Sequence, residues 1–325
     1  MRNSVSVHAL RAGNLTLPEN KFLAPLEDIE SRRTVPSLSF LIQHCSRVTR
    51  KTTRLVFDLG IRREPHFYQE DIRRHTMTRE PLSGRPDVID SLDSGDIASS
   101  DIDMVILSHV HWDHIGMPSD FPLSSFAVGH GSLDLLNGTK VLSNGGHSHF
   151  EKDLLPMERT VELPDPTRAR IHDEQVDCHQ DPVFYLGMLS QRLWRPFGPV
   201  PRTIDIFADG SVLLVDSPGH LPGHINLLCL VNLDPVRYVY LAGDACHDRR
   251  ILTGECNIAE WKDPKFPDKV CCIHLDREEA MNTIKMIRSL EMDGNSLGEV
   301  EVILAHDDQW AKDAEKRGRF FPGAL

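Results

Sequence analysis

Four metal-binding side chains fall within six positions of the chain, directly after an apolar run. His109, His111, Asp113 and His114 follow the segment 104–107, whose residues Met-Val-Ile-Leu predict a buried strand. Imidazole and carboxylate groups are costly to bury without partners, so core packing explains the cluster poorly. Open α/β sheets hold their active sites at strand ends, on loops that lead into helices. The run therefore predicts an α/β fold with a metal site at a strand end, and a histidine-rich surface loop is the alternative.

The composition is that of a globular protein with a substantial core. Of the 325 residues 40% are hydrophobic, and no apolar run approaches the roughly 20 residues of a membrane span. Residues 1–7 lack a signal-peptide core and alternate as a first strand would. Seven cysteines without regular spacing favour reduced thiols in the cytoplasm, and a net charge of −12 disfavours a nucleic-acid partner. We expect a single domain over residues 1–325.

Short apolar runs between turn signals predict most of the strands. They lie at 38–42, 54–58, 104–107, 125–128, 203–207, 212–216, 224–231, 238–241 and 300–304, with helices around 70–77 and from 276 onward. The segment 138–203 is irregular and rich in proline, and it is too long for a passive connection. We expect an insertion that covers the active site. Its aromatic residues either anchor it to the body or line the substrate site: Phe184, Tyr185, Trp194 and Phe197.

Three later segments repeat the pattern of an apolar run that ends in a metal-binding residue. They are 215–224 with His220 and His224, 239–245 with Asp244, and 302–307 with His306. Singly, such residues are commonly caps or turn residues. Together with the first cluster they supply five histidines and two aspartates, enough for two metal ions.

These residues and spacings resemble the metallo-β-lactamase superfamily, whose signature is His-x-His-x-Asp-His. The resemblance runs from about Val35 to the last strand and is poorest over 138–203. It implies an αββα sandwich, in which two mixed β-sheets pack face to face with helices on both outer faces. It also implies a two-metal site along one edge of the sandwich. The implied ligands are His109, His111 and His220 for the first metal, Asp113, His114 and His306 for the second, and Asp244 as the bridge.

The same resemblance suggests which residues support the ligands. Asp58 and Asp216 are candidates to orient ligand histidines through the free ring N–H, and strand-end capping is the alternative for both. His224 follows His220 with the spacing of a second ligand, but Pro222 and Gly223 lie between them. We therefore expect His224 to be a supporting hydrogen-bonding residue. Neutral imidazole and carboxylate suit zinc, so we expect two zinc ions, with manganese or iron as alternatives.

A hydroxide shared by two metals is a nucleophile at neutral pH and can attack a carbonyl or a phosphorus. Segments 217–224 and 243–245 match the loops of the lactonase-like branch, which includes fungal lactamase-like members. The resemblance implies that Asp113 passes a proton to the leaving group and that Asp244 bridges the metals. Quorum-quenching lactonases place a Tyr three residues after the bridging Asp, where this chain has His247. His247 is therefore a candidate to donate a hydrogen bond to the substrate or to act as an acid, and a surface histidine is the alternative.

The sequence thus predicts a dinuclear metal-dependent hydrolase that opens a small cyclic ester or amide, a lactone or a lactam. A phosphodiesterase or a thioesterase on the same metal core is the enzymatic alternative, and a binding scaffold without catalysis is the other. The expected partner is a small-molecule substrate, with no nucleic acid and no membrane. The ring atom, the native metal and the oligomeric state stay open, a homodimer included.

Overall fold

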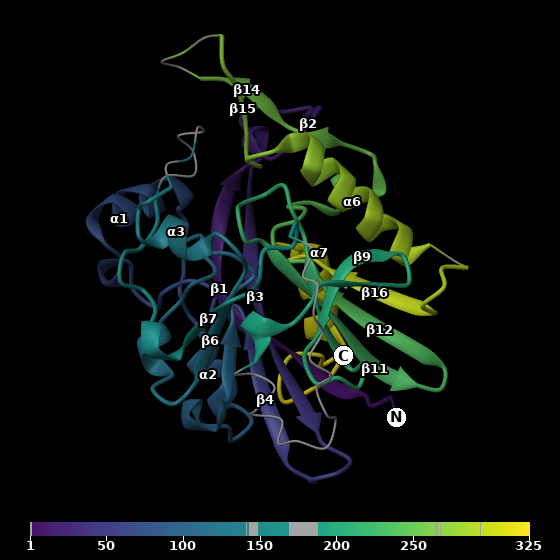
Figure 1. Cartoon of the computed structure of the whole chain (residues 1–325). Coiled ribbons are helices and arrows are strands. Elements are labelled where there is room, and N and C mark those ends of the chain that lie inside the picture. The colour runs from purple at the N-terminus through teal and green to yellow at the C-terminus, as the bar shows by residue number, and fades with distance from the viewer. Residues whose placement is uncertain are drawn as a thin grey trace.

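Two six-stranded sheets pack face to face in the computed structural model (Figure 1). The structure describes residues 2–140, 142, 149–168, 188–263, 266, 268–292 and 294–325. The first sheet has the order β1 (Val5–Pro18), β3 (Arg32–Cys45), β4 (Thr52–Phe57), β5 (Met104–Ile106), β6 (Ser125–Val128) and β7 (Thr160–Glu162). The second has the order β16 (Glu299–Ile303), β12 (Val236–Leu241), β11 (Ile225–Leu233), β10 (Val212–Asp216), β9 (Val200–Asp205) and β8 (Arg195–Phe197). Both sheets are mixed.

Helices lie outside both sheets (Figure 1). On the side of the first sheet are α1 (Glu70–Thr76), α2 (Val88–Asp93) and α3 (Ser132–Leu136). On the side of the second are α5 (Arg249–Thr253) and α6 (Arg277–Glu291), and α7 (Asp308–Lys316) packs beside β3. Two small two-stranded sheets pair β2 (Leu23–Ala24) with β13 (Asn257–Ile258) and β14 (Glu260–Lys262) with β15 (Val270–Cys272). The predicted αββα sandwich is confirmed.

The central strands are apolar on both faces because each face is covered. In β4, Leu55 and Phe57 face the layer between the sheets, whereas Val56 belongs to the core under the helices. In β10, Leu214 faces inward and Val215 outward in the same alternation. Such strands read as continuous apolar runs, which is why the sequence predicts them well.

The carboxyl ends of several strands meet at one edge of the sandwich. Strands β4 and β5 are parallel, and so are β12 and β16 in the other sheet. Strand β10 is antiparallel to β11, which is antiparallel to β12, so β10 and β12 also run the same way. The loops after these strands carry every predicted metal ligand, so one edge of the fold gathers them.

The structure corrects two expectations. The loop after β5 does not lead into an α-helix: Leu59 N–H donates to the His114 carbonyl and Gly116 N–H to the Gly60 carbonyl, so hydrogen bonds to the loop after β4 replace helical ones. The segment 138–203 is also less irregular than expected, since β7, β8 and the start of β9 lie in it. These strands lie at or next to the sheet edges, where short strands carry a weak sequence signal. Phe184 and Tyr185 lie outside the described residues, and the covering role of the segment stays a prediction.

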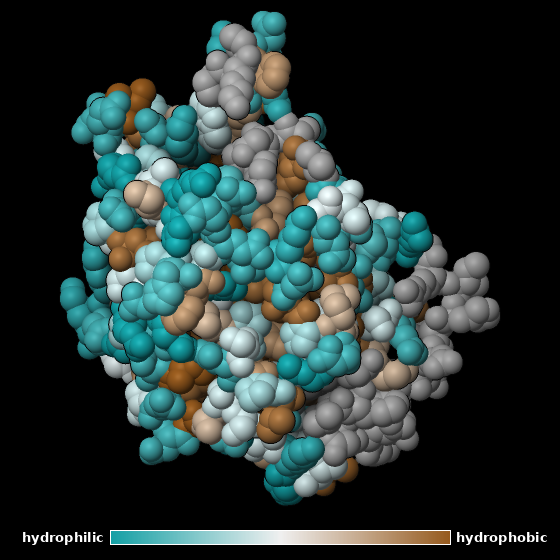
Figure 2. Space-filling model, turned by 90° about the vertical axis from the view of Figure 1, so that its left-hand side faces the viewer, coloured by the Kyte–Doolittle hydropathy of each residue, from teal (hydrophilic) through white to brown (hydrophobic). Residues whose placement is uncertain are grey.

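The side chain of Trp194 serves as an anchor, because its Nε1–H donates to the Pro164 carbonyl at 2.7 Å and its ring packs on the inter-sheet core. On the face shown in Figure 2, hydrophilic residues are interspersed with small hydrophobic patches. Within the described residues, no helix is both long and apolar enough to cross a membrane.

Candidate metal centre

One group of possible metal ligands combines the cluster after β5 with the loops of the second sheet. His111 Nδ1 lies 2.9 Å from His109 Nε2 and 3.1 Å from His220 Nε2. Asp244 Oδ2 lies 3.7 Å from His109 Nε2 and 3.6 Å from His220 Nε2. These four side chains are close enough together to hold one metal ion.

Asp113, His114 and His306 form a second such group next to the same aspartate. Asp244 Oδ1 lies 3.3 Å from His114 Nε2 and 3.2 Å from His306 Nε2, and Asp113 Oδ2 lies 3.6 Å from His306 Nε2. The two oxygens of Asp244 therefore face different groups, as those of a bridging carboxylate would. The structure brings all seven predicted ligands together, and their roles as ligands stay a prediction.

Hydrogen bonds fix which ring nitrogen faces the centre in the second group. His306 Nδ1 donates to the Pro36 carbonyl at 2.8 Å, and His114 Nδ1 donates to Asp58 Oδ2 at 2.8 Å. Because these oxygens only accept, the proton of each neutral ring sits on Nδ1 and Nε2 keeps its lone pair. Both lone pairs are directed at Asp244, whose Oδ1 has no hydrogen-bond partner in the described chain. Acceptors that face one another in this way fit a cation between them.

Asp58 orients the histidines from beneath. Its Oδ1 accepts from the Ser108 backbone N–H at 2.6 Å and its Oδ2 from the Ser108 hydroxyl at 2.7 Å. Since that hydroxyl proton goes to Asp58, the Ser108 Oγ accepts from His109 Nδ1 at 3.0 Å. Asp58 thus holds His114 directly and His109 through Ser108, and its role in supporting metal ligands stays a prediction.

The other two supporting candidates differ from each other. His224 is buried, and it accepts from the Asp244 backbone N–H at 3.1 Å through Nε2 while Nδ1 donates to the Ser217 carbonyl. Burial lowers the pKa of His224 to about 4, so this neutral tautomer is the stable one. Asp216, in contrast, accepts from Arg202 Nε at 2.5 Å, so its contact is with a surface arginine rather than with a ligand histidine.

His247 is buried against the metal ligands. Its Nε2 lies 3.1 Å from Asp244 Oδ2, and its ring packs against those of Phe22, His220 and His274. The alternative of a surface histidine is therefore wrong, because only 3% of the residue is exposed. Sequence reasoning missed His274, although it follows the apolar run 271–273 and so fits the same pattern as the other ligands.

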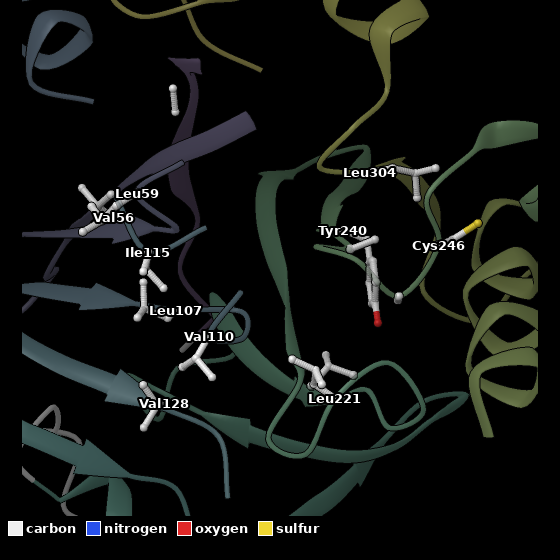
Figure 3. Close-up of a cluster of buried hydrophobic side chains, with 14 of the residues drawn as sticks. Val56, Leu59, Leu107, Val110, Ile115, Val128, Leu221, Tyr240, Cys246 and Leu304 are labelled. Atoms are coloured by element: carbon white, nitrogen blue, oxygen red, sulfur yellow. The ribbon is translucent and has the colours of Figure 1, made fainter. Parts of the chain in front are cut away.

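Apolar neighbours hold the ligand loops in place (Figure 3). Val110 lies within the first cluster and Ile115 directly follows it. Leu221 follows His220, and Cys246 precedes His247. All four apolar side chains are buried. Each ligand loop therefore alternates between polar residues that face the centre and apolar residues that pack in the core. This close packing stabilises the ligand loops.

The electrostatics favour neutral imidazoles in the first group and charged imidazoles in the second, around one charged carboxylate. Burial, with the neighbouring imidazoles, holds the pKa of His109 and of His220 well below its usual value. Burial opposes charge on Asp244 as well, but the facing imidazoles, that of His306 first, hold its pKa well below the usual range. At His114 burial is likewise outweighed by Asp244 and Asp58, which raise the pKa. A bound metal cation would neutralise the same negative charge that a proton on His114 neutralises.

A cavity opens onto these groups. Ligand and supporting residues line one part of it, and Leu15, Leu17, Phe22 and Ile273 line an apolar part. Trp112, His75, His149 and Arg79 complete the lining. In the described part of the segment 138–203, the Phe150 ring also stacks on His111 with a centroid distance of 6.1 Å.

No family model matches the sequence, but individual relatives do. The chain is 27% identical to "Cytochrome P450 monooxygenase mpaDE" of Penicillium brevicompactum over 291 residues, which are 84% of this chain and 30% of that protein. It spans about 30% of the length of the first three curated relatives it matches. It is also 27% identical to "Metallo-hydrolase mfmC" of Annulohypoxylon moriforme, covering 94% of this chain and 78% of the relative. "Gamma-lactamase FDB1" of Fusarium pseudograminearum is 26% identical, covering 71% and 50%.

Among solved structures, an N-acyl homoserine lactone hydrolase with N-hexanoyl-L-homoserine bound at its catalytic metal centre superimposes with a TM-score of 0.64. The match covers 100% of both chains at 15% identity, so it establishes the fold. The fold is therefore that of these lactone hydrolases, and the side-chain set is the one that the resemblance to the metallo-β-lactamase superfamily implies.

Proposed function

We propose that the chain is a dinuclear metal-dependent hydrolase that opens a small lactone or lactam ring. The observation that carries this proposal is the position of Asp244, whose two oxygens face two separate groups of imidazoles. When bound, two divalent metals, zinc first and manganese or iron next, would supply a nucleophilic hydroxide and polarise the carbonyl. The first metal would be held by His109, His111 and His220, and the second by Asp113, His114 and His306.

The remaining steps belong to the residues of this chain. Asp113 lines the cavity, where its carboxylate can take a proton and pass it to the leaving oxygen or nitrogen. His247 lines the same cavity beside Asp244 and is placed to donate a hydrogen bond to the substrate. The apolar lining from β1 excludes water from the ring that is attacked. The relative named gamma-lactamase supports a cyclic amide as the substrate class, and the relative named metallo-hydrolase supports metal-dependent hydrolysis.

The test combines a metal count with a substrate screen on protein purified without chelator. We expect two transition-metal ions per chain by elemental analysis, and hydrolysis of lactones or lactams above that of thioesters and phosphodiesters. Protein without stoichiometric metal would refute the dinuclear centre. Preference for a thioester or a phosphodiester would keep the centre but overturn the ring-opening reaction.

The role of His247 is tested by His247→Phe. Because the ring packs among buried side chains, phenylalanine preserves its volume while removing the hydrogen bond, and we expect kcat to fall about 10- to 100-fold with little loss of metal. His66→Phe, at an exposed position, is the control. If turnover and metal content both stay at the wild-type level, His247 has no catalytic role.

A further inference from the structure

Arg79 is partly buried, and no carboxylate lies within ion-pair distance of it in the described chain. It ends the short 3-10 helix η3 (Met77–Arg79), and its Nη1 donates to the Thr78 hydroxyl at 3.2 Å. Arg62 and Arg63, in contrast, contact Glu151 at 3.2 Å and Asp87 at 2.7 Å. A buried guanidinium is costly unless an anion meets it. The described chain offers Arg79 the longer-range attraction of the Asp113 carboxylate but no ion pair, and both residues line the metal-centre cavity.

The backbone around Arg79 is held firmly. Arg32 Nη2 donates to the Thr78 carbonyl at 3.0 Å and to the Glu80 carbonyl at 3.1 Å. On the far side of Glu80, the Thr16 hydroxyl donates to the Pro81 carbonyl at 2.8 Å. These bonds tie η3 to β1 and β3, so the arginine is presented to the cavity by fixed backbone.

The surroundings leave Arg79 as the one cation among the residues that line this part of the cavity. Burial, together with Arg79 and His149, lowers the pKa of His75 to about 4, so that ring is neutral. Burial also lowers the pKa of Arg79, but a guanidinium stays charged at neutral pH. Because the chain carries a net charge of −12, its long-range field does not attract anions, and a local cation is what would select one.

From this geometry we propose that Arg79 binds a carboxylate carried by the substrate, apart from the ring carbonyl that is attacked. The proposal rests on the proposed ring-opening function and names its substrate class, a lactone or lactam that bears an acid group. The planar guanidinium would bind the carboxylate by paired N–H donors. The acid group would then turn the ring carbonyl toward Asp244 and its neighbours.

Binding is tested without catalysis, on protein purified without chelator, by calorimetry with a cyclopentanone carboxylate and its carboxamide. Neither ring can be hydrolysed. We expect the acid to bind at least about tenfold more tightly than the amide, which is the strength of one charged hydrogen bond. Arg79→Met should abolish this preference and Arg79→Lys should retain part of it. The matched control is Arg74→Met, since that arginine is 70% exposed and pairs with Glu70. Thermal unfolding checks that each variant is folded.

Two results would overturn the proposal: no preference for the acid in the wild type, or a preference that survives Arg79→Met, since the metal centre would then bind the carboxylate. A γ-lactone carboxylate and its carboxamide test the reaction separately. If the acid preference appears but no ring is opened, the subsite stands and the proposed reaction fails. If both lactones are opened at equal rates and bind equally, the reaction stands and the subsite fails.

Discussion

Two carboxylates, one in β16 and one in the loop after the neighbouring strand β12, have opposite kinds of hydrogen-bonding surroundings. Glu301, in β16, accepts from Trp310 Nε1 at 2.9 Å, from Arg319 through both oxygens at 2.6 Å, and from Arg237 at 3.2 Å. Asp244, after β12, faces imidazoles whose protons are turned away toward Asp58 and Pro36. The protein neutralises the first carboxylate with its own donors. At the second it directs the Nε2 atoms of His114 and His306 toward the carboxylate, an arrangement that an added cation satisfies.

The difference separates a structural polar cluster from a functional one. Donors that already meet a carboxylate leave nothing for a ligand to do, however many charges gather there. Around Asp244, further acceptor atoms are held in place by hydrogen bonds to Asp58 and Pro36. Such a group of facing acceptors can bind a cation. Arg79 is the counterpart with the opposite charge, because no carboxylate of the described chain lies within ion-pair distance of its guanidinium.

The largest effect should follow from Asp244→Ala. Losing the carboxylate that faces both groups removes the bridge, and we expect kcat/KM to fall by about 10³-fold or more and the second metal to be lost. Elemental analysis and lactone hydrolysis measure the two losses. Glu301→Gln is the matched control and should keep both metals and activity. A fully metallated, active Asp244→Ala protein would mean that the bridge is assigned to the wrong residue.

A smaller effect should follow from Asp58→Asn. The amide matches the carboxylate in shape but no longer accepts through both oxygens, so Ser108 and His114 lose their fixed orientation. We expect metal affinity to fall about 10- to 100-fold, the usual cost of losing a group that orients a ligand histidine. Competition with a chromophoric chelator measures this affinity. Asp216→Asn should leave it unchanged, because Asp216 contacts Arg202, and equal losses in the two variants would refute the distinction.

Much of this centre was predictable from sequence because each ligand ends an apolar strand. Strands β6 and β10 match the predicted ranges to the residue, and Asp58 was expected at the end of β4. The short strands β7 and β8 were missed, since three residues near a sheet edge carry little periodicity. Arg79 and Phe22 had no local signal at all. They reach the cavity only through the packing of η3 and of the segment between β1 and β2, which is tertiary information.

The smallest effect tests the structural half of the comparison. Burial opposes the charge of Glu301, but hydrogen bonds from Arg319 and Trp310 lower its pKa from 4.5 to about 2. A carboxylate with a lowered pKa in the folded state stabilises the fold above its unfolded pKa, and this stabilisation is lost as the pH falls toward 2. We expect Glu301→Gln to lower the free energy of unfolding at pH 7 by about 1–2 kcal/mol, discounted for partial exposure.

Urea unfolding of both proteins between pH 7 and pH 3 measures how this difference depends on pH. The gap between wild type and Glu301→Gln should be constant above about pH 5 and shrink below it, while activity at pH 7 stays unchanged. A gap that does not change with pH would show that Glu301 acts by packing rather than by charge. Loss of bound metal in Glu301→Gln would show that the two carboxylates are coupled, and the contrast between a completed and an open cluster would then fail.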